Sequence, residues 1–150
     1  MFRAVDHAEL DPEAAARWAN FGQRVPLTYP GLLGLEVEEV RVDYCRMRLP
    51  ARNELLQAGG GVVHGGAIAS LLDSVVVPAI GAGLAPEAEF ATVDLHVQYH
   101  RALRGAAVAE GWVTRRGRRV VFCEAEAVSA DTGEVIARAL LTYNVALPRN

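Results

Sequence analysis

The stretch GGGVVHGG, residues 59–66, leads into a run of apolar residues at helical spacing that contains one carboxylate, Asp73. This spacing predicts a helix over residues 66–80 that other parts of the protein largely cover. A helix that begins at a glycine-rich turn directs unpaired backbone N–H groups toward whatever approaches it. The stretch is therefore typical of a site that combines an electrophile-stabilising helix end with a base. Because Pro78 lacks an N–H, we expect the helix to kink or end there.

The second half of the chain predicts an antiparallel sheet. Residues 91–100 alternate between apolar and polar side chains, and further strand-like runs cover residues 106–115, 120–130 and 135–145. Glycine-containing connectors suited to hairpin turns separate the last three runs. The alternation places Thr92 on the polar face of its strand, and the apolar face is predicted to hold Ala91, Val93, Leu95, Val97 and Tyr99. The predicted fold class is α+β, with the long helix against the apolar face of the sheet.

The first third of the chain predicts a short helix and two short strands. Asp11 followed by proline is typical of a helix start, and the pattern continues over residues 14–21. Residues 35–49 alternate in two registers, which predicts two strands separated by a turn or bulge near Asp43.

Composition limits the function classes. The chain has 150 residues, 51% of them hydrophobic, and a formal net charge of −3, so we expect one globular domain with no general affinity for nucleic acid. Its apolar runs are too short for a membrane span, and the N-terminus lacks the apolar core of a signal peptide. Cys45 and Cys123 lack metal-type spacing, which favours buried, reduced thiols. These features predict a cytoplasmic protein.

His64-Gly65-Gly66, followed by Asp73 in a helix and then by the strand ATVDL at residues 91–95, resembles a known family. This pattern is similar to that of hotdog-fold acyl-CoA thioesterases of the phenylacetyl-CoA thioesterase (PaaI-like) type, and the resemblance covers residues 34–145. It implies a hotdog fold, in which an antiparallel sheet wraps around one long central helix. Residues 34–150 would form the hotdog domain, and residues 1–33 an N-terminal helix and lead-in segment. The implied activity is hydrolysis of acyl-CoA to a free acid and CoA, without a metal or organic cofactor.

The resemblance also implies roles for five residues. The backbone N–H of Gly65 would polarise the thioester carbonyl, and Asp73 would act either as nucleophile or as general base. Thr92 would supply a hydroxyl that orients the water or the carboxylate. Gln57 is similar to an amide side chain that often precedes the turn, although the segment from Gln57 to His64 is one residue longer than in the family. His64 would act as a general acid or hold the turn in place, and we favour the second role.

Substrate contacts follow from the same resemblance. Gly66 and Val63 flank the predicted catalytic turn and would face the acyl-CoA. The phosphates of CoA need cationic partners, and Arg101, Arg118 and Arg119 are candidates. The arginines at residues 115–119 would alternatively form an ordinary solvated hairpin tip.

Other polar residues on the predicted strand have plainer explanations. His96 and His100 share a face by alternation, which would suggest a metal site together with His64 and Asp73 only if all four side chains converged. We expect no metal. Asp94 is expected to be a surface or interface charge.

The distance between Gly65 and Asp73 predicts an assembly. Eight positions of α-helix separate them, which is about 12 Å along the axis. One thioester carbon cannot lie next to both, so the site needs Gly65 of one chain and Asp73 of another. We expect a homodimer, and the family resemblance favours a homotetramer made of two dimers.

Two other functions remain open on sequence grounds. A hotdog dehydratase acting on a 3-hydroxyacyl thioester would need a His and a carboxylate across the dimer. A non-catalytic acyl-CoA-binding protein would use the same pocket without hydrolysis. The sequence does not select the acyl group, because aryl, medium-chain and branched groups all suit an apolar lining.

Overall fold

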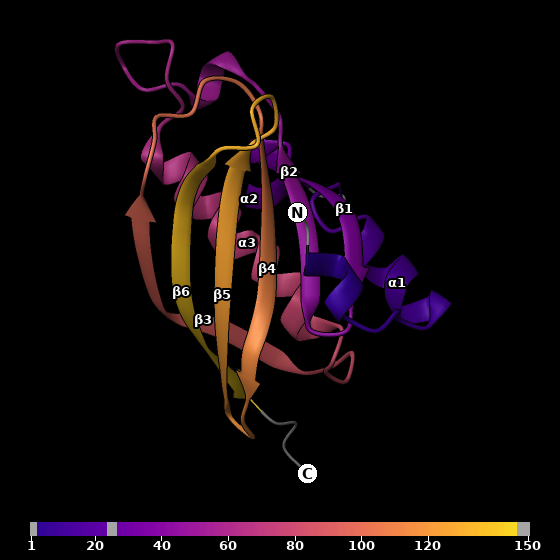
Figure 1. The fold of residues 1–150 in the computed structure, drawn as a ribbon. Helices are drawn as coiled ribbons and strands as arrows, with labels where there is room; N and C mark the ends of the chain where they lie inside the picture. The colour runs from indigo at the N-terminus through magenta and orange to yellow at the C-terminus, as the bar shows by residue number, and fades with distance from the viewer. Residues whose placement is uncertain (1–2, 24–26, 147–150) are drawn as a thin grey trace.

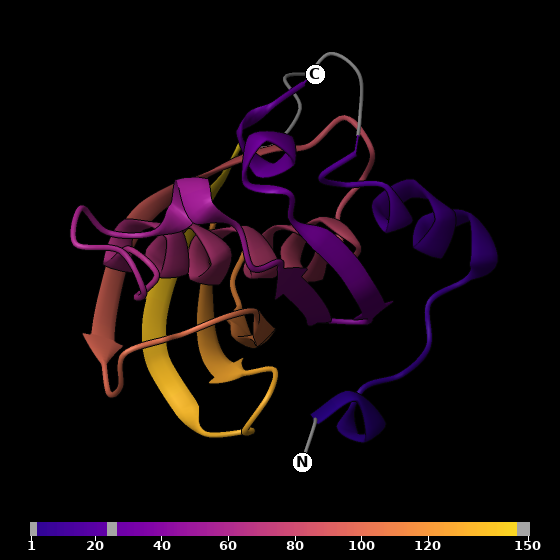
Figure 2. The same cartoon turned by 90° about the horizontal axis from the view of Figure 1, so that it is seen from above.

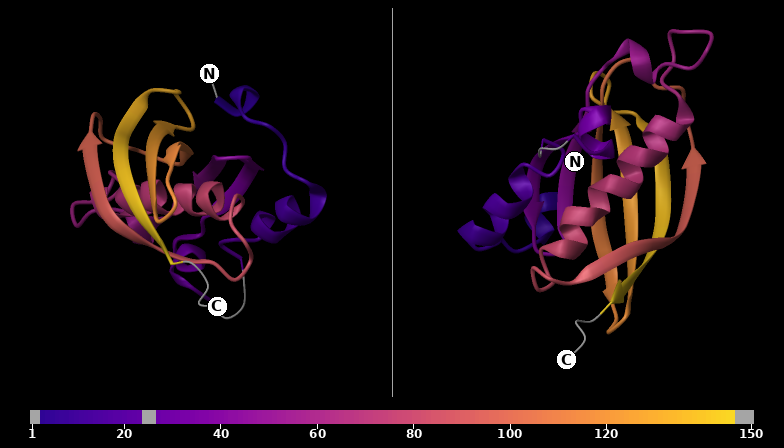
Figure 3. Two further views of the ribbon diagram at one scale, coloured as in Figure 1. Left: turned by 90° about the horizontal axis from the view of Figure 1, so that it is seen from below. Right: turned by 180° about the vertical axis from the view of Figure 1, so that it is seen from behind.

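The computed structural model describes residues 3–23 and 27–146, in which six strands form one antiparallel sheet and a long helix crosses one face of it (Figures 1 and 3). The strand order is β1-β2-β4-β5-β6-β3, so β1 and β3 are the two edges. The predicted α+β class is confirmed. The elements are η1 (Arg3–Asp6), α1 (Pro12–Ala19), α2 (Tyr29–Leu33), β1 (Glu36–Arg41), β2 (Tyr44–Leu49), η2 (Asn53–Leu55), α3 (Gly65–Gly81), β3 (Glu89–Tyr99), β4 (Ala107–Arg116), β5 (Val120–Ser129) and β6 (Val135–Ala146).

Helix α3 forms the centre of the hydrophobic core. Its apolar stripe, which includes Leu71, Leu72 and Val75, is fully buried against the sheet. The helix approaches β4 closely because Gly111 has no side chain: a Cβ there would lie 2.8 Å from methyl groups of Val75 and Val76. We expected the helix to kink or end at Pro78; it does not end there and runs on to Gly81. One lost backbone bond is tolerated because burial of the apolar stripe stabilises the helix.

The N-terminal part of the chain covers the β1 side of the molecule. Asp11 caps α1 as predicted, accepting hydrogen bonds from the backbone N–H groups of Glu13 and Ala14, although the helix ends at Ala19, two residues before the predicted limit. Trp18 packs against Gly81, where a Cβ would lie 2.1 Å from the indole. The short turn η1 lies on the other face of the sheet from α3, as the view along the strands shows (Figure 2).

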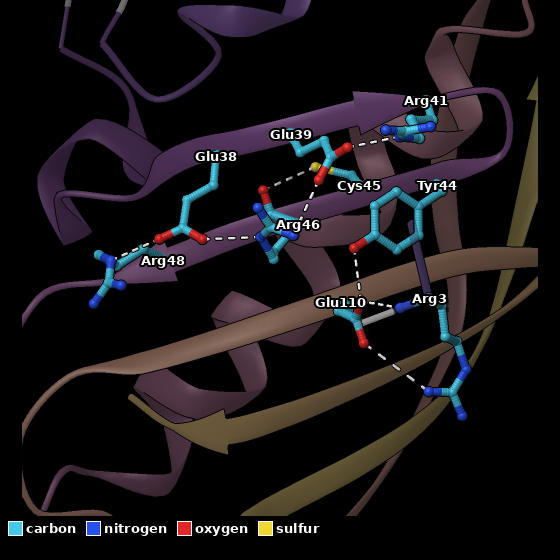
Figure 4. Close-up of polar contacts among 9 residues, drawn as sticks. All are labelled: Arg3, Glu38, Glu39, Arg41, Tyr44, Cys45, Arg46, Arg48 and Glu110. Atoms are coloured by element: carbon cyan, nitrogen blue, oxygen red, sulfur yellow. Dashed lines mark hydrogen bonds and ion pairs between the residues drawn. The ribbon is translucent and has the colours of Figure 1, made fainter. Parts of the chain in front are cut away.

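The two edges of the sheet differ in character. Edge strand β1 carries charged side chains that pair across to β2, as in the ion pairs of Glu38 with Arg46 and Arg48 (Figure 4). Helix α1 also packs against it. The β1–β2 turn is at Asp43, which has a φ of 58°, close to the predicted break. Edge strand β3 is 11 residues long and mostly exposed, and a long open edge of this kind is a template for pairing with another chain.

Candidate active site

The first turn of α3 leaves one backbone donor free. His64 precedes the helix, and its ring Nδ1 accepts a hydrogen bond from the Gly66 N–H at 2.9 Å. The Ala67 N–H bonds to the His64 carbonyl, and the His64 N–H to the Leu55 carbonyl. Within the described residues, the Gly65 N–H has no acceptor. The positive end of the helix dipole adds to the attraction of this donor for an oxyanion. The favoured role of His64, holding the turn, agrees with this geometry.

The glycine-rich turn is closed by its own backbone. The Gln57 N–H donates to Val62, and Gly60 donates back to the Gln57 carbonyl. Gly60 and Gly61 have φ values of 70° and 71°, which a side chain would strain. Gln57 is exposed, and its side chain makes no hydrogen bond to other described residues. The structure therefore shows only a backbone role for Gln57.

Neighbouring residues tie this turn to the loop after β3. Arg104 donates from Nη1 to the Gly61 carbonyl at 2.8 Å, and the Val63 N–H donates to the Leu103 carbonyl. Val63 is only 5% exposed and belongs to the hydrophobic core. Gly66 is exposed at the helix start, where a Cβ would lie 2.9 Å from the His64 ring.

Asp73 is held by two hydroxyl groups from the sheet. Its Oδ1 accepts from Thr92 Oγ1 at 3.0 Å and from the Tyr143 hydroxyl at 2.5 Å, and the same phenol lies 2.9 Å from the Asp73 backbone carbonyl. Oδ2 has no partner among the described residues. Burial, reinforced by the bond to Asp73, raises the pKa of Tyr143 well above its ordinary value, so the phenol stays a donor.

A bulge in β3 places Thr92 at this site. Thr92 pairs with Tyr143 on β6, but the next pair is Asp94 with Thr142, so Val93 is an extra residue. The bulge brings Thr92 onto the α3 face together with Leu95, whereas Val93 is 65% exposed. The predicted single apolar face of this strand was therefore wrong on the N-terminal side of the bulge. An extra residue reverses the side-to-side alternation of a strand.

Tyr99 lies beside the free donor. Its hydroxyl donates to the Gly65 carbonyl at 2.8 Å, and its ring lies 3.3 Å from the position of a Cβ on Gly65. Half of its surface is exposed. Strand β3 thus contacts both ends of the site, near Asp73 through Thr92 and near Gly65 through Tyr99. Neither Tyr99 nor Tyr143 was predicted as a site residue. The one sequence signal for them is the alternation of apolar and polar residues in their strands, which places both tyrosines among the apolar positions.

The candidate phosphate-binding arginines lie at two ends of the molecule. Arg101 is exposed near the glycine-rich turn and lies 3.6 Å from Glu134. Arg118 and Arg119 are exposed at the tip of the β4–β5 hairpin. This tip is at the C-terminal end of α3, where Arg116 donates to the Ile80 carbonyl (Figure 1). Since α3 has 17 residues, the two groups are separated by about 25 Å along the helix.

The other polar residues of β3 face away from the site. Asp94 and His96 pair with Thr142 and Leu140, whose side chains lie on the face of the sheet opposite α3. In the described part of the chain, no three His, Cys, Asp or Glu side chains gather as metal ligands would. No helix there has both the length and the apolarity to cross a membrane.

Comparison with known proteins places these residues in a family. Residues 60–136, which include the glycine-rich turn, Asp73 and Thr92, match the model of the Thioesterase superfamily. This chain belongs to the thioesterase superfamily. A relative from Halobacterium salinarum named "Putative esterase" is 36% identical to this thioesterase over 107 residues, which cover 68% of this chain and 71% of the relative.

Solved structures agree with the fold of this thioesterase. A conserved protein of Pseudomonas aeruginosa is 28% identical and superimposes with a TM-score of 0.74 over 79% of this chain and 94% of its own. The PaaI protein of Escherichia coli, from the phenylacetic acid degradation operon, superimposes with a TM-score of 0.69 at 18% identity, over 78% of this chain and 83% of its own. The predicted hotdog fold is confirmed, and the protein is a thioester hydrolase, as the sequence predicted.

Proposed function

We propose that this thioesterase hydrolyses acyl-CoA to a free carboxylic acid and CoA, at two sites that each combine residues of two chains. The observation that carries the proposal is the pair formed by the free Gly65 N–H and the Asp73 carboxylate. Both belong to one uninterrupted helix and are about 12 Å apart along its axis. Since a reacting carbon must lie about 3 Å from its base and its carbonyl oxygen about 3 Å from its donor, one chain alone does not complete a site.

The open edge of β3 supports a dimer of suitable geometry. In an antiparallel pair of β3 strands with a two-fold axis at His96, and with Val93 left out of the count as the extra residue of the bulge, Thr92 of one chain lies across from the partner's Tyr99. Because Thr92 contacts Asp73 and Tyr99 contacts Gly65, this pairing brings Asp73 toward the partner's Gly65. Both α3 helices then lie on the same face of a continuous sheet.

The same symmetry supports a role for the separated arginines. An antiparallel arrangement places the partner's β4–β5 tip at the end of the dimer where Gly65 of the first chain lies. Arg101 of one chain and the partner's Arg118 and Arg119 would then contact the phosphates of one CoA. Contact between the two outer faces would extend the dimer to a tetramer.

The chemistry needs no group beyond these residues and water. As a general base, Asp73 takes a proton from water, the hydroxyl adds to the thioester carbon, and Gly65 donates to the oxyanion. Collapse expels the CoA thiolate, which takes that proton, so the products are an acid and a thiol. As a nucleophile, Asp73 Oδ2 displaces the thiolate to form an anhydride, which water then cleaves. Label found in Asp73 after a single turnover in ¹⁸O-labelled water identifies the second route, because only attack of water on the Asp73 carbonyl carbon of the anhydride places it there.

The experiment that tests the proposal measures CoA release with a thiol reagent across aryl-, short-chain and long-chain acyl-CoAs. We expect Asp73→Asn to lose turnover by orders of magnitude while light scattering shows the assembly unchanged. Asp94→Asn is the matched control, because that carboxylate lies on the other face of β3, and it should keep wild-type turnover. Full activity of Asp73→Asn would contradict the proposal, and hydration of an enoyl thioester without CoA release would indicate a dehydratase instead.

A further inference from the structure

Tyr143 is a buried residue whose hydroxyl contacts the carboxylate of Asp73 directly. It is 2% exposed and lies on β6, directly opposite Thr92 in the register with β3. Its hydroxyl donates to Asp73 Oδ1 at 2.5 Å, and Thr92 donates to the same oxygen. Two donors on one carboxylate oxygen fix the rotation of the whole group, because the other oxygen must then point away from them.

We infer that Tyr143 is a positioning residue that, with Thr92, anchors Oδ1 of Asp73 so that Oδ2 is the oxygen that reacts. The inference rests on the proposed role of Asp73 and adds to it the choice of oxygen and the residue that makes the choice. It applies to both routes, since Oδ2 either accepts the proton of water or attacks the thioester carbon.

The two contacts of the phenol suit a carboxylate whose charge changes during turnover. A phenol has one proton, and two Asp73 acceptors lie within its reach, Oδ1 at 2.5 Å and the backbone carbonyl at 2.9 Å. The charged carboxylate attracts this proton more strongly than the carbonyl does. When Oδ2 becomes protonated or acylated, Oδ1 loses charge, and the carbonyl offers the proton a second acceptor without movement of the ring. Tyr143 thus stabilises the anionic form of Asp73 selectively.

The chain contains a matched control for this contact. Tyr44, also fully buried, donates to Glu110 Oε1 at 2.6 Å on the opposite face of the sheet (Figure 4). Its pKa is raised by burial and by Glu110, as that of Tyr143 is raised by burial and by Asp73. Tyr44→Phe and Tyr143→Phe therefore remove similar buried bonds, and only the second removes one from the candidate site.

The test compares the pH dependence of kcat/KM in these variants. Removing a donor to the carboxylate destabilises its charged form, so in Tyr143→Phe we expect the acid limb to move up by roughly one pH unit, with kcat about tenfold lower at neutral pH. Tyr44→Phe should lower the melting temperature comparably and leave the profile in place. Thr92→Val should move the limb in the same direction, and Thr92→Ser should restore it.

The outcomes separate this inference from the proposed function. If Asp73→Asn is inactive but the profile of Tyr143→Phe superimposes on that of the wild type, the positioning role is wrong and the hydrolase site stands. If Asp73→Asn is active, the proposed site itself is wrong. Should Tyr143→Phe not fold, 3-fluorotyrosine can replace tyrosine instead, because fluorine makes the phenol of residue 143 a stronger donor. The chain used for this carries Tyr99→Phe, so that no fluorinated phenol lies beside Gly65. The acid limb should then move down, and an unmoved limb would overturn the inference.

Discussion

Mixing two inactive variants tests whether each site uses Gly65 of one chain and Asp73 of the other. Asp73→Asn removes the carboxylate and keeps the Gly65 N–H, whereas Gly65→Pro removes this N–H and keeps Asp73. Proline suits the first position of a helix, and His64, with φ −61° and ψ 134°, already has the backbone that a residue before proline requires. Gly65→Ala is the matched control, because it keeps the N–H and its Cβ meets only the half-exposed Tyr99 ring at 3.3 Å.

The expected activities follow from the number of complete sites. Removal of an oxyanion donor costs about 10²- to 10³-fold in kcat, so each variant alone should be nearly inactive. Equal mixing makes half of the dimers mixed, and one of the two sites in a mixed dimer has both an intact Gly65 and an intact Asp73. The mixture should therefore recover about a quarter of the wild-type activity per chain. Gly65→Ala should change turnover by less than about tenfold.

The assay unfolds the two variants together, refolds them and measures CoA release at known chain concentration. Each variant refolded alone gives the background, and wild-type protein taken through the same procedure gives the yield. Light scattering confirms that the mixture has the mass of the wild-type assembly. Activity equal to the sum of the two backgrounds would refute the shared site, since sites contained within one chain stay broken in every combination.

Three further predictions concern the turn, the core and the thiols. His64→Ala should lower the free energy of unfolding by about 1 kcal/mol, because it removes the acceptor for Gly66, and His64→Asn should keep both stability and turnover; loss of turnover in His64→Asn would indicate an acid–base role instead. Gly111→Val should cost about 1–3 kcal/mol in denaturant unfolding, since its Cβ would lie 2.8 Å from Val75 and Val76, while Gly59→Ala, with open space around it, should be neutral; equal effects would contradict the packing described. Burial raises the pKa of Cys123 from 9.0 to about 12, so above pH 9 the unfolded chain releases this proton before the folded one, and stability should fall by up to about 1.4 kcal/mol per pH unit until pH 12. Denaturant unfolding at pH values from about 8 to about 10 checks this decline in stability, which should be shallower in Cys123→Ala.

The sequence predicted those parts of the site that depend on local pattern. The glycine-rich turn, the helix after it and Asp73 follow from spacing along one segment, and their separation along the helix follows from helical geometry. Tyr143 and Tyr99 were missed because their contacts depend on how strands distant in sequence align with α3. The bulge was missed because Thr92-Val93-Asp94 alternates in polarity whether or not Val93 is an extra residue.

The arginines illustrate the same limit. Arg101 and Arg118 are close in sequence, yet β4 runs the length of the sheet between them and carries the hairpin tip to the opposite end. Residues that flank a strand lie at its opposite ends. The presence of arginines in both segments does not show which end of the sheet faces the substrate. The burial of Val63 depends on similar long-range contacts, since its N–H bonds to the loop after β3 and its side chain completes the core.

The extra residue in β3 has a consequence for comparing this chain with its relatives. Side chains that face α3 are two positions apart in the regular part of the strand after Asp94. Across the bulge they are three positions apart, from Thr92 to Leu95. A relative with a regular strand lacks the extra residue, so its sequence needs a one-residue gap opposite Val93 before its hydroxyl residue aligns with Thr92. Position-by-position matching without that gap would pair Thr92 with a residue on the wrong face and would report a missing site group in an intact enzyme.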